Sequence, residues 1–194
     1  MRRVLVLAAT LTVCLVAPAA AGGPNHVVTA SPTADGSQIH RAGVQAAVTG
    51  ADSIDSTNLA RAMPHDCTGC EGIAVAFQAV IYHGDPSNLS PNNTAVAVNS
   101  NCTHCGAFAF AYQYVVKADD GAQLSSDGRA RIADIRSQAT DAVDSGLPYD
   151  QLDARLKDLG AQFQAAVDDD LQSGGDHPRG GRDREDTDTQ PAGS

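Results

Sequence analysis

A motif that occurs three times constrains the fold of this chain more than any other feature. Three asparagines each precede a glutamine by twenty positions, and successive copies lie 33 and 35 residues apart. A repeat of this length is one supersecondary unit copied in tandem, so one copy can be interpreted and the result applied to all three. The last two copies share Asn-x-Ala-x-Ala, Cys-Thr-x-Cys and Ala-x-Ala-[Phe/Tyr]-Gln-x-Val. The paired residues are Asn25 and Gln45, Asn58 and Gln78, and Asn93 and Gln113.

Within each copy the side-chain pattern predicts strands. From Ile73 to Tyr82, and again from Ala107 to Val116, large apolar or aromatic residues alternate with alanine, glutamine or valine. A period of two is the side-chain period of a β-strand, and β-branched and aromatic residues favour that conformation. The segments Asn58–Met63 and Asn93–Val98 alternate more weakly. Each copy therefore contains two strands separated by a short turn.

The turn between the two strands predicts a β-hairpin. Where the later copies carry Cys-x-x-Cys, the first carries Ala34-Asp35-Gly36-Ser37, and Asp-Gly between alternating segments is a strong hairpin signal. We therefore expect an α+β fold in which residues 22–118 form an antiparallel sheet of three tandem β-hairpins. Pairing through this turn sets Phe77 opposite Ala60, a large side chain against a small one. The alternative is a β-solenoid in which the copies stack in parallel.

Both ends of the chain differ from the repeats. Arg2 and Arg3, the apolar run Val4–Val16 and small residues up to Ala21 are the parts of a secretory signal peptide. We therefore expect cleavage after residue 21 and a secreted or extracytoplasmic protein. Residues 173–194 are polar, charged and interrupted by glycine and proline, and are predicted to be a disordered tail.

Residues 119–172 predict a helical hairpin. Here the apolar period becomes helical, with Ser125 or Ser126 as the N-cap of the first helix and Pro148 near the first turn of the second. A short connection between two amphipathic helices places them antiparallel. Their apolar stripe is expected to cover the sheet, and the alternative is a coiled coil or partner-binding stalk. Self-association through this hairpin is a further expectation.

The expected mature chain contains four cysteines in two Cys-x-x-Cys motifs, and four chemical states are open to them. Local disulfides are favoured, because residues flanking a two-residue hairpin turn are within disulfide reach and an exported protein meets oxidants. Crossed disulfides, a zinc site with all four cysteines as ligands and a redox-active pair are the alternatives. In a flat sheet, neighbouring hairpins lie roughly 10 Å apart, which disfavours the crossed and zinc forms. The residues are Cys67, Cys70, Cys102 and Cys105.

The composition excludes some partners, and the motifs indicate no catalytic chemistry. A net charge of −10 repels nucleic acid and anionic lipid, and no apolar run is long enough to span a bilayer. The sequence has no His-Glu-x-x-His, nucleophile elbow, P-loop or dinucleotide fingerprint. We expect neither a metal nor another cofactor. His65, His83 and His104 fall in predicted loops and turns and are interpreted as surface residues.

The repeated polar residues have two interpretations. Asn58, Asn93, Gln45, Gln78 and Gln113 could line a shared binding strip along the sheet. They could instead be structural, as a side-chain ladder or a solvated face, and the structural interpretation is favoured because it needs no ligand.

Two repeat units and the helical pair carry a resemblance to known sequences. Through Asn58–Ile81 and Asn93–Val116, the chain resembles a group of uncharacterised exported actinobacterial proteins. A similar region occurs at the end of some peptide zinc metalloprotease-like membrane proteins. The resemblance covers roughly Asn25–Leu171 and implies no activity, since the peptidase motif is missing here. The sequence therefore predicts an exported non-enzymatic module that binds an unknown protein or cell-surface ligand. A thiol-disulfide redox protein and a four-cysteine zinc-binding module are the alternatives.

Overall fold

The repeats stack in parallel. The computed structural model describes residues 23–172 and 184–188, so the predicted signal peptide lies outside the described residues. Each repeat contributes one strand to each of two sheets, ordered β1-β3-β5 and β2-β4-β6. We call each successive pair of strands a rung. The first rung is β1 (His26–Ala30) and β2 (Gln38–Thr49), the second is β3 (Ser53–Ala62) and β4 (Glu71–Tyr82), and the third is β5 (Asn88–Ala97) and β6 (Gly106–Lys117).

The predicted antiparallel sheet of three hairpins is therefore wrong, and the β-solenoid alternative describes the arrangement. The two strands of a rung belong to different sheets and do not pair as a ladder; each pairs in parallel with its equivalent in the next rung. Phe77 accordingly lies beside Val44 and Tyr112 in its own sheet, and Ala60 belongs to the other sheet. The physical reason is burial. β4 is covered on both faces, and strands of that kind belong to parallel sheets enclosed between two layers.

Small side chains fill the space between the two sheets. The buried cluster there consists almost entirely of alanine, with Val28 as its largest member. Because alanine adds so little thickness, the two backbones approach closely enough for Asn58 Nδ2 in one sheet to reach the carbonyl oxygen of Ala76 in the other, at 3.1 Å. The alanine positions are Ala30, Ala60, Ala62, Ala74, Ala76, Ala107, Ala109 and Ala111.

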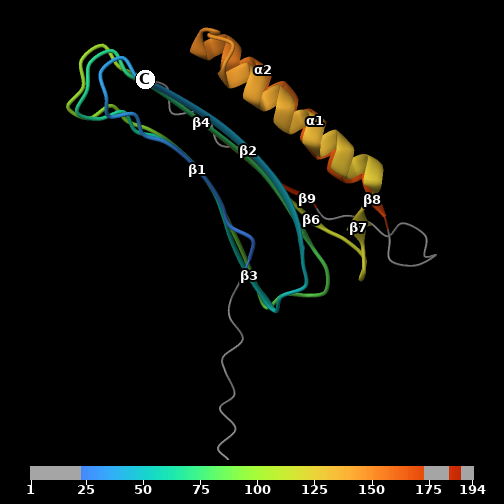
Figure 1. The fold of residues 1–194 in the computed structure, drawn as a ribbon. Helices are drawn as coiled ribbons and strands as arrows, with labels where there is room; N and C mark the ends of the chain where they lie inside the picture. Colours follow the sequence, from blue (N-terminus) through green and yellow to red (C-terminus); the bar gives the residue numbers. More distant parts are fainter. Residues whose placement is uncertain (1–22, 173–183, 189–194) are drawn as a thin grey trace, which may run out of the picture.

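The large side chains of β4 and β6 face the helices. Phe77 and Phe110 are fully buried in a cluster with the apolar stripes of α1 (Ser126–Val143) and α2 (Tyr149–Asp170). Figure 1 shows the resulting three layers, with the helices over the outer face of the β2-β4-β6 sheet. The alternation predicted for β4 and β6 is thus correct, and so is the helical hairpin that covers a sheet.

Short elements close the helical layer. Ser125 caps α1 as predicted, with its Oγ accepting from the Gly128 amide at 2.8 Å. β7 (Gln123–Leu124) pairs with β8 (Leu171–Gln172), which ties the start of α1 to the end of α2. Within the predicted disordered tail, β9 (Arg184–Asp188) lies antiparallel to β6, and the rest of 173–194 lies outside the described residues. In the part of the chain that the structure describes, no helix is both long and apolar enough to cross a membrane.

Candidate functional site: a four-cysteine cluster

The cysteines lie in the arcs, the segments that join the two strands of a rung. We number them as the first arc (31–37), the second arc (63–70) and the third arc (98–105). The second and third arcs have the same backbone course: Asp66 and Asn101 have φ of 55° and 50°, and Gly69 and His104 have φ of 66° and 56°. Glycine, Asn, Asp and His are the residues that most readily adopt these left-handed positions. The same local sequence logic thus produces two superimposed turns.

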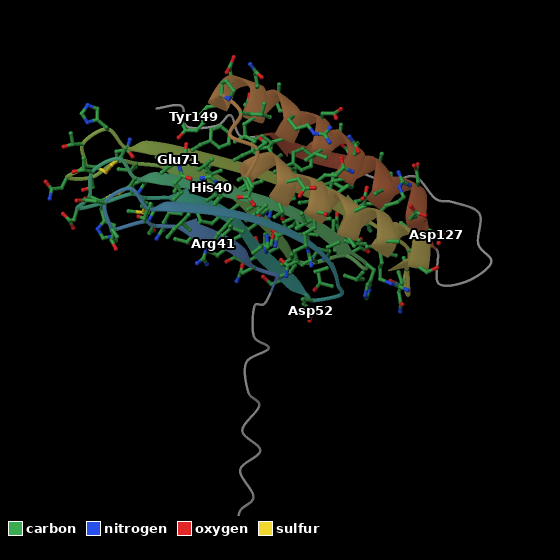
Figure 2. The ribbon with its side chains drawn as sticks, turned by 45° about the horizontal axis from the view of Figure 1, so that its top comes forward. His40, Arg41, Asp52, Glu71, Asp127 and Tyr149 are labelled. Atoms are coloured by element: carbon green, nitrogen blue, oxygen red, sulfur yellow. A yellow bond between two sulfur atoms is a disulfide. The ribbon has the colours of Figure 1, made fainter. Side chains whose placement is uncertain are left out.

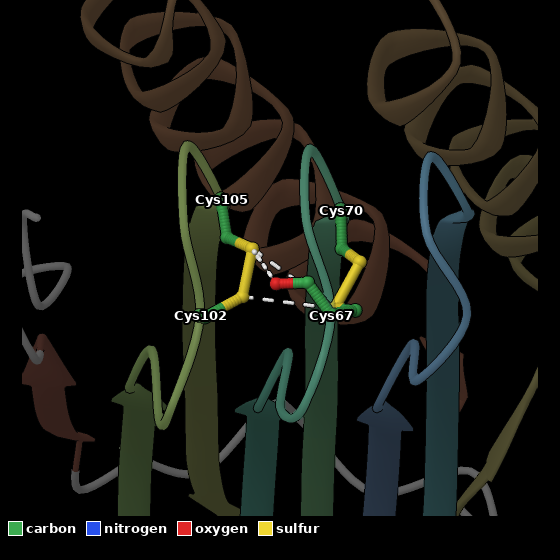
Figure 3. A group of neighbouring side chains, drawn as sticks. All are labelled: Cys67, Cys70, Cys102 and Cys105. Carbon is green, nitrogen blue, oxygen red and sulfur yellow. Dashed lines mark hydrogen bonds between the residues drawn. A yellow bond between two sulfur atoms is a disulfide. The ribbon is translucent and has the colours of Figure 1, made fainter.

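Stacking of the arcs brings all four sulfurs together. Thr68 bridges Thr103 in parallel, so the arcs continue the register of the strands. Within each motif the two Sγ atoms lie at disulfide distance, pairing Cys67 with Cys70 and Cys102 with Cys105. Between motifs, Cys67 Sγ is 3.6 Å from that of Cys102 and 4.0 Å from that of Cys105. All four lie within 4.8 Å of one another. Figure 3 shows how the four side chains gather at the two arcs. The roughly 10 Å separation expected from a flat sheet does not apply, because neighbouring parallel strands are only about 4.8 Å apart.

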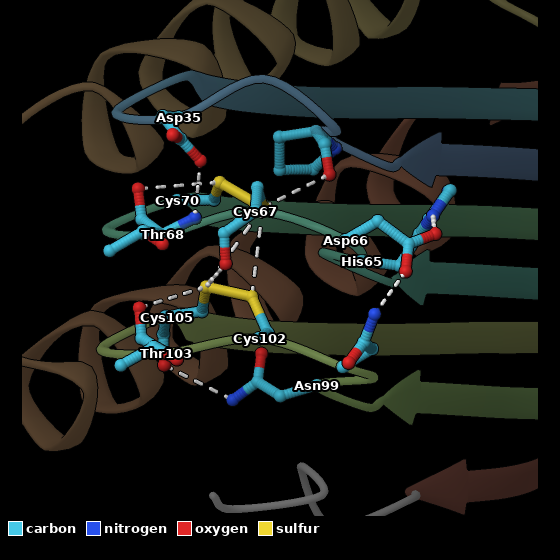
Figure 4. Close-up of a disulfide and its surroundings, with 12 residues drawn as sticks. Asp35, His65, Asp66, Cys67, Thr68, Cys70, Asn99, Cys102, Thr103 and Cys105 are labelled. Atoms are coloured by element: carbon cyan, nitrogen blue, oxygen red, sulfur yellow. Dashed lines mark hydrogen bonds and ion pairs between the residues drawn. A yellow bond between two sulfur atoms is a disulfide. The ribbon is translucent and has the colours of Figure 1, made fainter.

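The surroundings of the sulfurs are rich in carbonyl oxygens. Cys70 Sγ lies 3.2 Å from the Ala34 oxygen, and Cys105 Sγ lies 3.5 Å from the Cys67 oxygen. The arc amides that could stabilise a thiolate donate elsewhere, such as Gly69 N to the Thr103 oxygen at 2.8 Å. Figure 4 shows the sulfur contacts. These contacts of the sulfurs are to acceptor oxygens, whereas the partners that activate a reactive cysteine are donors and positive charges.

Asp66 adds a negative charge beside the cluster. Its carboxylate accepts a hydrogen bond from Asn101 Nδ2 at 2.6 Å, and His65 Nδ1 lies 3.1 Å away. These two hydrogen bonds, the one from Asn101 first, lower the pKa of Asp66 below its ordinary value. Asp66 directly precedes Cys67 and adds an exposed negative charge to the second arc.

The repeated glutamines form a ladder between the two sheets. Gln113 Nε2 donates to Gln78 Oε1 at 2.7 Å, and Gln78 Nε2 donates to Gln45 Oε1 at 3.2 Å. Gln78 and Gln113 are 0% and 1% exposed. Amide groups stacked at the rung spacing hydrogen-bond to one another, and the ladder ends at Gln113, whose buried Oε1 has no partner among the described residues. These glutamines are thus engaged in the interior, away from any surface strip.

The repeated asparagines form a second ladder, but its first position is a histidine. Asn58 Nδ2 lies 2.9 Å from Asn93 Oδ1 and 2.9 Å from the backbone carbonyl oxygen of Tyr112. The strand register sets His26 opposite Asn58, so the sequence alignment of Asn25 with Asn58 is displaced by one residue. Asn25 lies before β1, where its Oδ1 accepts from the Thr57 amide at 2.9 Å.

A group of titratable side chains that the sequence did not indicate lies near the start of β2 and β4. His40 has Asp144 Oδ1 3.2 Å from its Nδ1 and Glu71 Oε2 3.2 Å from its Nε2. Tyr149 donates to the other Glu71 oxygen at 2.9 Å, and burial together with this carboxylate raises the pKa of Tyr149. Figure 2 labels His40, Glu71 and Tyr149, which come from both sheet and helix. Each group already has a protein partner, so the chain of contacts ties the turn between the helices to the sheet.

A pocket lies between β2, the segment before α1, and α1 itself. Its walls are apolar, but two guanidinium groups and an imidazole line it. Arg129 donates to the Leu124 oxygen at 2.6 Å, and Arg136 donates to the oxygen of Val44. The full lining is Ala46, Val48, His83, Gly121, Ala122, Gln123, Leu124, Arg129, Ile132 and Arg136. No sequence motif indicated this site, because its residues come from four separate segments.

The three histidines interpreted as surface residues all lie in loops or turns. His65 and His83 pair with Asp66 and Asp120, at 3.1 and 3.4 Å, and His104 occupies the left-handed position of the third arc.

A scan against protein-family models and searches of curated proteins and solved structures found no match to this chain.

Proposed function

We propose that the protein is an exported, non-enzymatic binding module and that the pocket between β2 and α1 takes a small amphipathic anion. The observation that carries this proposal is the lining of the pocket. Arg129, Arg136 and His83 line it together with alkyl side chains, in a chain of net charge −10. A concave apolar site with a few convergent polar groups is the usual form of a small-molecule site.

The charges around the pocket support an anionic ligand. Each arginine uses one nitrogen on a backbone carbonyl, and a guanidinium has five N–H donors, so donors remain for a carboxylate. Asp120 is the nearby acid, and it lies against His83. The apolar members Ala46, Val48 and Ile132 offer a surface for a short hydrocarbon chain. A carboxylate with an alkyl tail matches both features.

Separate observations support the two other parts of the proposal, that the protein is exported and that it is not an enzyme. Two cysteine pairs at disulfide distance are typical of an oxidising compartment. The buried polar residues of the repeats, Asn58, Gln78 and Gln113, form hydrogen bonds inside the solenoid. The polar groups Arg129, Arg136 and His83, which line the pocket, are suited to binding an anion.

The proposal is tested by calorimetric titration with octanoate and with octanol, which has the same tail and no charge. Octanoate is expected to bind at least ten-fold more tightly. Val48 is 44% exposed at the pocket wall, so it accepts either charge without disturbing the core. Val48→Lys should strengthen octanoate binding, and Val48→Glu should weaken it.

A charge change elsewhere provides the control. Arg155 pairs with Asp158 on α2 and does not line the pocket, so Arg155→Gln should leave the affinity unchanged. Equal binding of octanoate and octanol, or equal responses to the two Val48 variants, would refute an anion site.

A further inference from the structure

The four cysteines not only close the turn in each of two arcs but also bring their sulfurs together across the arcs. The first arc, one residue shorter, contains no cysteine, and it shares the left-handed glycine near its end, since Gly36 has φ of 67° where Gly69 has 66°. Its Asp35 accepts the Thr68 amide at 2.7 Å and so links it to the second arc. The turn therefore does not require a disulfide. The cysteine pairs stand in the second and third arcs, which are neighbours in the stack, and they bring four ligand atoms to one place.

The distances between the arcs match a tetrahedral thiolate site. Zinc binds Cys sulfur at about 2.3 Å, which places the sulfurs of a site with four thiolate ligands roughly 3.8 Å apart. From Cys67 Sγ, the sulfurs of Cys102 and Cys105 lie 3.6 and 4.0 Å away, on either side of that value. Within each motif the Cα atoms are 6.3 and 5.9 Å apart, and only the side chains need to turn outward once the sulfur–sulfur bonds open.

We propose that the reduced form of the cluster binds one Zn²⁺ through Cys67, Cys70, Cys102 and Cys105. Reduction of the two disulfides consumes four electrons and four protons, supplied by two molecules of a dithiol reductant that is itself oxidised to disulfides. Zinc then replaces the thiol protons, which pass to water. The metal crosslinks the second and third arcs, whereas each local disulfide closes only one arc.

A bound metal also changes the electrostatics around the sulfurs. The carbonyl oxygens of Ala34 and Cys67 lie 3.2 Å from Cys70 Sγ and 3.5 Å from Cys105 Sγ, and neither is a donor or a positive charge. A divalent cation at the centre supplies the positive charge that these groups lack, and it deprotonates coordinating thiols outright. The four sulfurs are thus suited as a ligand set for a soft or borderline metal.

The test uses the full mature chain, reduced with excess phosphine and titrated with Zn²⁺ or with Co²⁺ as a spectroscopic probe. We expect one metal per chain, a Co²⁺ spectrum with thiolate charge-transfer bands and tetrahedral d–d intensity, and no binding to the oxidised protein. Zinc should raise the Tm of the reduced protein by roughly 5 °C or more at about 100 times its Kd, because it binds the folded state.

Variants separate the four-cysteine site from weaker alternatives. Cys102→Ser/Cys105→Ser retains only one motif and should weaken zinc binding at least 100-fold. His104→Asn keeps a residue that tolerates the left-handed backbone and should leave affinity unchanged. Two metals per chain, a Tm that falls with zinc, or an octahedral Co²⁺ spectrum would overturn the proposal, and these readings on the unaltered chain do not depend on whether the serine variant folds.

Discussion

The first rung and the two rungs that follow share one backbone frame but fill it with different side chains. The second and third rungs place asparagine opposite alanine, as Asn58 Nδ2 donates to the Ala76 oxygen and Asn93 Nδ2 to that of Ala111. The first rung has His26 at the asparagine position and Gly43 at the alanine position. A Cβ on Gly43 would stand 2.6 Å from His26 Nε2. The larger side chain is thus matched by the smaller one.

The arcs differ in the same way. The second and third are closed by cysteine pairs, and the first is tied by the Asp35 carboxylate, which accepts the Thr68 amide. What all three rungs keep is the parallel register and the glutamine ladder. The comparison indicates that the stacked backbone depends on the positions that all three rungs share. At the positions that differ, two residues change together, as His26 and Gly43 do in place of asparagine and alanine.

The largest expected effect comes from breaking the asparagine ladder in its central rung. Asn58→Ala removes the Nδ2 group from two backbone carbonyls and from Asn93, and the site is 0% exposed. Leaving buried acceptors unsatisfied should cost about 3 kcal/mol of unfolding free energy, measured by urea denaturation. Asn93→Ala, in the half-buried terminal rung, should cost less. A larger loss for Asn93→Ala would show that the ladder is not centred on the second rung.

The pairing of His26 with Gly43 predicts a rescue. Gly43→Ala alone should cost about 2 kcal/mol, because the new methyl group meets both the imidazole and Val28 Cγ2 at 2.7 Å. His26→Asn in the same chain removes the contact with the imidazole but leaves the one with Val28, so it should recover part of the loss. Urea denaturation of both single variants and the double variant gives the coupling energy. Additive single effects would refute the match.

The sequence predicted the faces of the strands but not their partners. The alternation around Phe77 is correct because side-chain period depends only on the strand itself. The Asp35-Gly36 pair suggested a hairpin, but it reports a left-handed backbone at Gly36 and does not say which strand comes next in the sheet. The informative signal was alanine on the second face of β4. It made both faces apolar, which favours an enclosed parallel strand.

The candidate sites followed this pattern. The cysteines were evident as residues, yet their convergence depends on rung stacking and could not follow from a hairpin model. His40, Glu71 and Tyr149 are far apart in the sequence and come together only when the helices cover the sheet. The pocket between β2 and α1 has the same origin. Sequence period can indicate layers, but contacts between layers need the tertiary arrangement.

A third prediction transfers the cysteine solution to the first arc. Ala34→Cys/Ser37→Cys places a Cys-x-x-Cys where the backbone already matches the second arc. A disulfide that closes four residues should stabilise the oxidised protein by up to about 2 kcal/mol, and reduction should abolish the gain. Removing Cys67 and Cys70 together should cost a similar amount. Thermal unfolding with and without a reductant measures both, and a destabilised oxidised variant would show that the arcs differ in shape.

The smallest expected effect is a pH dependence of the unfolding free energy that comes from His26, which stands where the other rungs have asparagine. Burial, aided by the charge of Arg136, lowers the pKa of His26 below 6.5, against a hydrogen bond to Gly43 that raises it. Below about pH 6.5 the unfolded chain therefore binds a proton that the folded chain does not, so stability falls as pH decreases toward the folded-state pKa and levels off beneath it. The difference in unfolding free energy between the wild type and His26→Asn isolates this contribution, because every other titrating group is common to both. Relative to the variant, the wild type should lose stability between pH 7.5 and pH 5. An opposite slope would mean that the folded state stabilises the imidazolium, and His26 would then be a charged residue at the rim of the solenoid.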